Sequence, residues 1–241
     1  ALAPTDRARS AYHGRVNDRA ATAGPRCAVL VLNHDGREHL EACLGSLGAM
    51  DVFVPGRPGE PVDAATPDEV WLVDNGSGDG SLELVRDRFP WVRTLRHDGN
   101  LGFSEGYNRA VPVCPARFVV LLNNDTRVAP GFLSELLAVR ERRGAVAAAG
   151  RILSWDGTTT DFAGADTFFT GHAWQRDLGQ APPPEPPPET RLLFGCAGAL
   201  LVSREAFLEA GGFDPDYFSF FEDVDLGIRL FVTEVDERPR I

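Results

Sequence analysis

Three apolar segments of the sequence each end in small polar residues, and this repeated pattern restricts the fold more than any other feature. The segments are "CAVLVLN" at 27–33, "EVWLVDN" at 69–75 and "FVVLLNND" at 118–125. β-Branched residues favour strands, whereas Asn and Asp are poor strand formers, so each segment predicts a buried strand that stops at its polar end. A single polar end is typical of a turn. Three of them at the same end of one sheet are typical of a binding site.

Helical patterns alternate with these strands. Helices are predicted for "GREHLEACLGSL" at 36–47, "SLELVRDRF" at 81–89, "GFSEGYNRAV" at 102–111 and "GFLSELLAVRER" at 131–142, and a further short strand for "VRTLRH" at 92–97. This alternation predicts an α/β fold, a doubly wound and mostly parallel sheet flanked by helices in a single domain. Ligands bind such sheets at the carboxyl ends of the strands, where the polar clusters lie.

The second half of the sequence is less regular. The segment at 191–213 predicts a strand, a turn, a second strand and a short helix, and "FSFFEDVDLGIRLF" at 218–231 predicts another helix. The proline-rich "APPPEPPPE" at 181–189 predicts an extended, exposed loop. Prolines also predict an irregular insertion at 49–68, and residues 1–25, rich in Ala and Arg, predict a loose tail.

The charge of the chain excludes several functions. The formal net charge is −11, and all 24 basic residues are Arg, because the sequence contains no Lys. A negative chain has no general attraction to nucleic-acid phosphates, so no nucleic-acid partner is expected. The absence of Lys excludes a P-loop lysine, a Schiff-base lysine and a lysine general base. An anionic ligand must therefore be held by Arg, by backbone N–H groups or by a metal.

The cysteines and the apolar segments bear on the compartment. Cys27, Cys43, Cys114 and Cys196 form no CxxC pair, which argues against a zinc site, and three of them lie in or beside apolar segments. Buried, reduced thiols in a cytosolic protein are expected. No apolar run approaches the roughly 18 residues that a transmembrane helix needs. The first residues lack the apolar core of a signal peptide.

Two carboxylates at strand ends allow both a structural and a chemical interpretation. Asp125 suits a turn, or it ligates a divalent cation such as Mg²⁺ or Mn²⁺. Such a cation needs only one or two protein carboxylates when the substrate brings a diphosphate. Asp74 suits an Asx-turn, or it accepts hydrogen bonds from the base or ribose of a nucleotide.

Three further acids lie close together in the last predicted helix. Glu222 and Asp223 follow the aromatic run "YFSFF". Acids at a helix start are often caps, but aromatic neighbours also desolvate a carboxylate and raise its pKa toward that of a useful base. Asp225 lies four residues before Arg229, which predicts a structural ion pair on the helix.

Six short segments in order resemble a known family. They are "VLNHDG", "VDNGSGDGS", "NLGFSEGYNRAV", "LLNNDTRVAPGFL", "FGCAGALLVSREAF" and "GGFDPDYFSFFEDVDLGIR". Over residues 27 to about 230 the chain resembles the inverting glycosyltransferases of family two, which have the GT-A fold. The "NNDT" and "FFEDVDL" forms are most similar to the rhamnosyltransferase-like branch.

The resemblance implies a function in cell-surface polysaccharide biosynthesis. An inverting, metal-dependent enzyme would transfer a sugar from a nucleotide-diphosphate sugar, either dTDP-rhamnose or a UDP-sugar, to a hydroxyl of a glycan or lipid-linked acceptor. Mg²⁺ or Mn²⁺ is the implied cofactor. The implied location is cytoplasmic, with peripheral contact at the inner face of the membrane. Residues 26–241 would form the GT-A domain, with a donor half at 26–130 and an acceptor half at 131–241.

The resemblance also implies roles for individual residues. Asp125 takes the metal-binding place of the DxD motif, and Asp223 takes the place of the general base in the ED motif. The residues that match donor-binding positions are Asn33, Asp35, Asp74, Asn100, Gly102, Asn123 and Asn124. The residues that match acceptor-side positions are Glu222, Cys196, Ala197 and Gly198.

Alternatives and one departure remain beside this interpretation. A sugar-phosphate nucleotidyltransferase is the first alternative, but its Gly-rich loop with Arg and Lys is missing after the first strand, where "NHDGREHLE" stands. A non-catalytic, sugar-nucleotide-binding relative is the second, and the intact Glu222–Asp223 pair argues against it. Many relatives carry a metal-binding His after the ED helix, whereas this sequence has no His beyond His172. Either the chain is trimmed or that ligand is absent.

Overall fold

A computed structural model of the chain describes residues 26–50, 69–168, 172–185 and 188–236. The expected tail at 1–25 lies outside the described residues, as do most of the expected insertion and two residues of the proline-rich loop. The described part of that loop contains no helix or strand and is mostly exposed.

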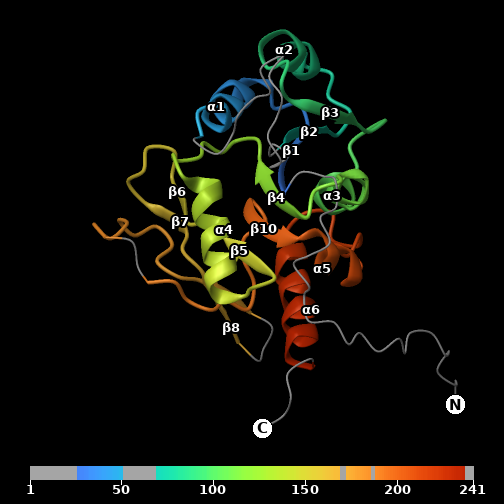
Figure 1. Cartoon of the computed structure of the whole chain (residues 1–241). Coiled ribbons are helices and arrows are strands. Elements are labelled where there is room, and N and C mark those ends of the chain that lie inside the picture. The colour runs from blue at the N-terminus through green and yellow to red at the C-terminus, as the bar shows by residue number, and fades with distance from the viewer. Residues whose placement is uncertain (1–25, 51–68, 169–171, 186–187, 237–241) are drawn as a thin grey trace, which may run out of the picture.

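A six-stranded sheet forms the centre of the molecule, with the strand order β3-β2-β1-β4-β10-β5 (Figure 1). Its strands are β1 (Cys27–Asn33), β2 (Glu69–Asp74), β3 (Arg93–Arg96), β4 (Phe118–Asn123), β5 (Ala147–Ala149) and β10 (Ala199–Ser203). β1 pairs in parallel with β2 and β4, and β2 pairs in parallel with β3. β10 runs antiparallel to β4 and β5. The expected mostly parallel sheet is confirmed, and the polar ends of β1, β2 and β4 lie side by side.

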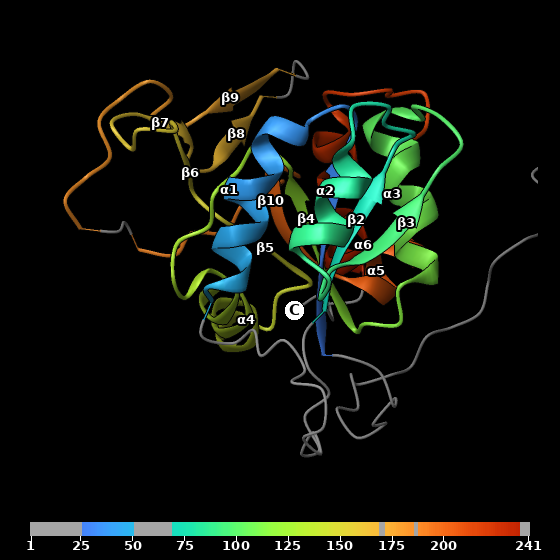
Figure 2. The same cartoon turned by 90° about the horizontal axis from the view of Figure 1, so that it is seen from above.

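Helices cover both faces of this sheet, as parallel strands require (Figure 2). They are α1 (Arg37–Gly48), α2 (Ser81–Arg88), α3 (Gly102–Val113), α4 (Phe132–Arg143), α5 (Arg204–Glu209) and α6 (Glu222–Asp236). Helices α1, α2 and α4 pack on one face, onto side chains such as Val29 and Val120. Helices α3, α5 and α6 pack on the other, onto side chains such as Leu30 and Leu121. Successive residues of each strand therefore contribute to two apolar layers, one on each face of the sheet.

Two small hairpins follow β5 and precede β10 in the sequence. They are formed by β6 (Ile152–Leu153) with β7 (Thr160–Phe162), and by β8 (Ala165–Thr167) with β9 (Ala173–Gln175). Of the two strands expected at 191–213, only the second forms, as β10. The first expectation was wrong because β5 already pairs with the free side of β10. The chain before β10 instead runs as irregular backbone toward the polar edge of the sheet.

Helix α3 fastens the later part of the chain to the sheet. The hydroxyl of the fully buried Tyr107 donates to the carbonyl oxygens of Leu30 at 3.3 Å and Leu122 at 3.0 Å. The side chain of Asn108 donates to the carbonyl oxygen of Phe213 and accepts from its N–H, both at 2.8 Å. One helix thereby fixes both the parallel strands and the segment that leads to α6.

The burial of the cysteines and the character of the helices can be compared with the sequence-based expectations. Cys27, Cys43 and Cys114 are buried, as expected, Cys196 is half-buried, and none of these four described cysteines forms a disulfide. Among the residues that the structure describes, no helix has the length and apolar character needed to cross a membrane.

Candidate active site

The ends of β1 and β2 are joined by one serine. The side-chain amide of Asn33 donates to the Ser77 hydroxyl oxygen at 3.0 Å, and the N–H of Asp35 donates to the same oxygen at 3.0 Å. The N–H of Ser77 donates to Asp74 Oδ2 at 3.1 Å. Sequence reasoning missed Ser77, although its place three residues after Asp74 is the pattern of an Asx-type turn. The structure brings three expected donor-binding residues together around it.

Asp74 has an oxygen that lacks a partner. Its side chain is fully buried, and Oδ1 has no hydrogen-bond partner in the described part of the chain. Oδ2 lies 3.8 Å from the guanidinium of Arg96. An unpaired buried acceptor destabilises a protein by about 1–3 kcal/mol, so such groups are rare. Oδ1 is therefore a buried acceptor without a donor at the end of β2.

The loop that contains Asn100 leads into α3 at Gly102 and lies against the end of β2. The N–H of Gly102 donates to Asn100 Oδ1 at 2.9 Å. The buried side-chain amide of Asn75 donates to the Gly102 carbonyl oxygen at 2.8 Å. Sequence reasoning assigned no role to Asn75, but its position directly after Asp74 puts it at the same strand end. Asn100 and Gly102 are thereby held next to the end of β2.

The end of β4 carries the expected metal-binding residue. The side-chain amide of Asn124 donates to Asn33 Oδ1 at 2.6 Å, which ties this loop to β1. A Cβ on Gly36 would lie 2.1 Å from Asn124 Nδ2, so only glycine allows this approach. Asp125 is exposed, and the structure gives it no hydrogen bond or ion pair within the described ranges. Its carboxylate is thus open to a ligand from solvent.

The antiparallel direction of β10 brings the acceptor-side segment to the same edge. Because β10 begins where β4 ends, the N–H of Asn123 donates to the Gly198 carbonyl oxygen at 3.2 Å. The N–H of Ala197 donates to Asp223 Oδ2 at 3.3 Å. Cys196 lies near enough to Asp223 that the carboxylate adds to the effect of burial, which raises the Cys196 pKa to about 11. The segment 196–198 therefore lies between the β4 end and the acid pair.

The acid pair begins α6, directly after a strained loop. Phe220 and Phe221, in the pre-α6 loop (residues 217–221), have left-handed φ angles of 73° and 69°. Non-glycine residues in this conformation are uncommon and concentrate at functional sites. Both phenylalanine rings are exposed, whereas Glu222 is only 6% exposed and its Oε2 has no hydrogen-bond partner among the described residues.

Burial changes the proton affinity of both acids. Desolvation raises the pKa of Glu222 to about 7, and the neighbouring Asp223 carboxylate adds to this rise. Desolvation also raises the pKa of Asp223, against the opposing effect of N–H groups of Ala197 and Val224. Asp225 differs because Arg229 Nε donates to its Oδ2 at 2.9 Å, which confirms the expected ion pair. The three acids therefore have different environments: burial raises the pKa of Glu222 and Asp223, whereas Asp225 is engaged by Arg229.

Glu222→Gln is expected to make the protein more stable at alkaline pH. The folded-state pKa of about 7 exceeds the ordinary value of 4.5, so the folded protein binds this proton more tightly than the unfolded chain and loses stability as the pH rises from 4.5 to 7. Gln removes this loss. Urea unfolding should show a gain of about 1–3 kcal/mol at pH 8 and little change near pH 4.5. Asp225→Asn, which breaks a formed ion pair, is the control and should bring no gain. An equal effect of Glu222→Gln at both pH values would contradict the assignment.

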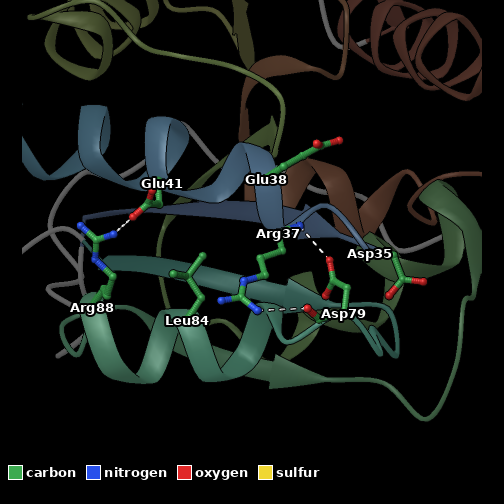
Figure 3. A pocket seen from close by; sticks show the side chains of 7 residues that line it. All are labelled: Asp35, Arg37, Glu38, Glu41, Asp79, Leu84 and Arg88. Atoms are coloured by element: carbon green, nitrogen blue, oxygen red, sulfur yellow. Dashed lines mark hydrogen bonds and ion pairs between the residues drawn. The ribbon is translucent and has the colours of Figure 1, made fainter.

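A cavity of about 680 Å³ lies between α1 and α2 (Figure 3). It is lined by Asp35, Arg37, Glu38, Glu41, Asp79, Leu84 and Arg88. Both arginines on its lining have partners: the Arg37 guanidinium donates to the Asp79 carbonyl oxygen at 3.4 Å, and Arg88 forms an ion pair with Glu41. The cavity shares Asp35 with the ends of β1 and β2 and does not include the acid pair.

The residues present fit a divalent cation with few protein ligands. No group of three His, Cys, Asp or Glu side chains that could hold a metal occurs in the described ranges. An oxygen-rich site with one exposed carboxylate, Asp125, nevertheless matches the way Mg²⁺ and Mn²⁺ bind when phosphates and water complete the coordination. The cation would then arrive with the donor and would not be held by the protein alone.

The mixed sheet with its polar strand edge and the acid pair at the start of α6 agree with the expected GT-A fold. The chain belongs to glycosyl transferase family 2, whose family model matches residues 29–209. The protein is therefore a glycosyltransferase, and the nucleotidyltransferase interpretation is set aside.

Known proteins with similar sequences or folds agree with this assignment. An N-acetylglucosaminyl-diphospho-decaprenol L-rhamnosyltransferase of Mycobacterium tuberculosis is 29% identical over 225 residues, which cover 84% of this chain and 69% of that relative. TarS 1-349 of S. aureus in complex with UDP-GlcNAc has a TM-score of 0.58 at 15% identity, over 86% of this chain and 53% of that one. The mannosyltransferase PcManGT from Pyrobaculum calidifontis, with GDP-Man and Mn²⁺, has a TM-score of 0.56 at 17% identity, over 84% and 50%. The chain thus spans about half of these solved structures, whose likeness shows the fold.

Proposed function

We propose that the protein transfers a sugar, with inversion, from a nucleotide-diphosphate sugar to a hydroxyl of an acceptor. The observation that carries the proposal is the hydrogen-bonded edge that runs from Asn123 through Gly198 and Ala197 to Asp223. Asp125, whose carboxylate is open to a cation, follows one end of this edge, and Asp223, whose pKa is raised, lies at the other end. A leaving diphosphate and an attacking hydroxyl need these two groups on either side of the reacting carbon.

The nucleoside is proposed to bind at the ends of β1 and β2. Asp74 Oδ1 is a buried acceptor without a donor, and a pyrimidine imide N–H of UDP or dTDP would supply one. Asn33 and Asp35, joined through Ser77, and the Asn100–Gly102 loop flank this position. The side chains of Asn123 and Asn124 extend the proposed donor site toward Asp125.

Asp74→Ala is expected to weaken binding of UDP or dTDP by about 1–3 kcal/mol, because the imide N–H would lose its buried partner. Isothermal titration calorimetry with Mn²⁺ present measures this. Asp161→Ala, an exposed change on β7, is the control and should bind like the wild type. Unchanged affinity of the Asp74→Ala variant for both nucleotides would refute this position of the nucleoside.

Asp223 is proposed to act as the general base. Its Oδ2 accepts a hydrogen bond from Ala197, which orients the carboxylate, and burial raises its pKa above the ordinary range. A carboxylate with a raised pKa is a stronger base at neutral pH. It would take the proton of the acceptor hydroxyl while that oxygen attacks the anomeric carbon and the nucleoside diphosphate leaves. A single displacement of this kind inverts the anomeric carbon.

A divalent cation, Mg²⁺ or Mn²⁺, held by Asp125 and the donor diphosphate would offset the negative charge of the leaving group. The Mn²⁺ in the complex of the mannosyltransferase PcManGT supports this assignment. Glu222, Cys196, Ala197 and Gly198 are proposed to line the acceptor side. Glu222 Oε2, a buried atom without a hydrogen-bond partner, is available to an acceptor hydroxyl.

The mycobacterial relative supports a particular substrate pair. Its name specifies an L-rhamnosyl group and N-acetylglucosaminyl-diphospho-decaprenol, so dTDP-rhamnose is the first donor to test and a lipid-linked acceptor the first acceptor. A UDP-sugar is the alternative donor, supported by the UDP-GlcNAc complex of TarS. A lipid-linked acceptor would place the cytoplasmic protein in peripheral contact with the inner face of the membrane.

A transfer assay tests the proposed function. The wild type is incubated with Mn²⁺, a short-chain polyprenyl-diphospho-N-acetylglucosamine, and either dTDP-rhamnose or UDP-GlcNAc. We expect release of the nucleoside diphosphate and an acceptor heavier by one sugar, with proton–carbon coupling in NMR showing the inverted anomer. A product with retained configuration would refute the single displacement. No transfer from either donor would refute this substrate pair.

A further inference from the structure

The loop that precedes the acid pair is held by the first residues of α3. The N–H of Phe103 donates to the carbonyl oxygen of Phe218 at 2.8 Å. The hydroxyl of Ser104 donates to the carbonyl oxygen of Tyr217. Ser104 is 1% exposed, so water does not compete for its hydrogen bond. These two bonds fix the pre-α6 loop at a point only a few residues before Glu222.

Gly102 allows the two segments to approach each other. Its φ is +77°, a conformation that residues with a side chain rarely adopt. A Cβ at this position would lie 2.6 and 2.7 Å from two ring carbons of Phe218 and 2.8 Å from the Phe218 carbonyl oxygen. The ring could rotate away, but the carbonyl is backbone and already accepts from Phe103. Any side chain at position 102 would therefore displace the pre-α6 loop.

The pre-α6 loop has little freedom to absorb such a displacement. Phe220 and Phe221 both have left-handed φ angles, and this conformation persists only where the surroundings hold it. Their rings are 81% and 55% exposed, so packing of the rings does not hold them. Backbone contacts hold this loop at both ends. At its start, the carbonyl oxygens of Tyr217 and Phe218 accept hydrogen bonds from α3. At its end, the Phe221 carbonyl oxygen accepts from Asp225 N–H at 3.1 Å.

We infer that Gly102 and Ser104 are positioning residues for the general base. They hold the pre-α6 loop and thereby set where Asp223 lies relative to the donor. The Gly102 carbonyl also accepts from Asn75 beside the nucleoside end, so one short segment contacts both ends of the site. This inference rests on the proposed function. It assigns Gly102 a second role, in positioning Asp223, in addition to its proposed role in binding the donor.

Gly102→Ala tests the inference against a matched control in the same loop, Gly99→Ala, whose Cβ would meet nothing within 4 Å. In Gly102→Ala, hydrogen exchange of residues 217–222 and of the Phe103 amide should rise about tenfold or more. With saturating donor and Mn²⁺, the single-turnover transfer rate should fall about a hundredfold, the scale of a displacement near 1 Å, and this fall should exceed any loss of affinity for UDP and dTDP. Gly99→Ala should match the wild type in all three measurements.

Ser104→Ala provides a second variant without backbone strain. It removes one hydrogen bond to the pre-α6 loop and should lower the transfer rate about tenfold with unchanged nucleotide binding. If Gly102→Ala does not fold, normal exchange and a normal rate in Ser104→Ala overturn the inference. Loss of nucleotide binding in Gly102→Ala, with unchanged exchange at residues 217–222, also overturns it. If the wild type transfers no sugar from either donor, raised exchange in Gly102→Ala supports the contact with the pre-α6 loop, and the missing transfer refutes the proposed substrate pair.

Discussion

Asp223→Asn is expected to lower the single-turnover rate of sugar transfer by about a hundredfold or more, the scale of general-base catalysis. Asn keeps the shape of the side chain and can still accept the hydrogen bond from Ala197 N–H, but it cannot take a proton from a hydroxyl. Donor binding should stay near the wild-type value, because Asp223 is proposed to act on the acceptor. Rapid-quench measurements with a single donor equivalent separate the chemical step from binding.

The neighbouring acids provide the controls for this prediction. Asp225→Asn should transfer sugar near the wild-type rate, because Asp225 is already engaged by Arg229. Glu222→Gln should alter acceptor affinity more than the chemical step, since its unpartnered Oε2 is proposed to bind an acceptor hydroxyl. A wild-type rate in Asp223→Asn together with an inactive Glu222→Gln would move the base to Glu222, whose pKa of about 7 also suits that role.

Asp125→Ala is expected to abolish the effect of Mn²⁺ on nucleotide binding while leaving the fold intact. Asp125 is exposed at the end of β4 and the structure gives it no ion pair in the described residues, so its removal breaks no internal contact. Because the chain contains no Lys, only Arg side chains and backbone N–H groups could offset the charge of a diphosphate without a cation. Calorimetric titration of UDP with Mn²⁺ and with EDTA should give a large difference in the wild type and none in the variant.

The control for the metal prediction is an exposed acid elsewhere. Asp161→Ala on β7 removes the same charge at a distance from β4 and should keep the wild-type response to Mn²⁺. Unfolding curves of Asp125→Ala should coincide with those of the wild type. Equal affinity of the wild type for UDP in Mn²⁺ and in EDTA would show that the cation does not assist binding, and the metal assignment would then be wrong.

The parallel half of the fold was predictable from sequence because its signals are local. Apolar runs that end in Asn or Asp, separated by helical periodicity, predicted β1, β2 and β4 and their shared edge. The second half was less predictable. The strand expected before β10 does not form, since the place beside β10 is taken by β5, and strand competition of this kind is a tertiary effect.

The resemblance named Asp74 and Asp223 as site residues, and their roles stay predictions. The structure places Asp74 at the end of β2 and Asp223 at the start of α6, where it accepts a hydrogen bond from Ala197 N–H. Sequence reasoning did not reveal that Asp74 Oδ1 lacks a partner, because burial and hydrogen bonding depend on the whole fold. It also missed Ser77 and Ser104, whose hydroxyls join segments far apart in the chain.

The two hydrogen bonds between Asn108 and Phe213, residues 105 positions apart, restrict how such enzymes can be recombined. A chimera built to change acceptor preference would naturally be cut after residue 130, at the expected boundary between the donor and acceptor halves, with everything downstream taken from a relative. That cut separates Asn108 from Phe213 and Phe103 from Phe218, so the new segment would pack against an α3 from a different protein. The exchangeable unit is instead discontinuous, and α3 has to be exchanged together with the residues that lead into α6.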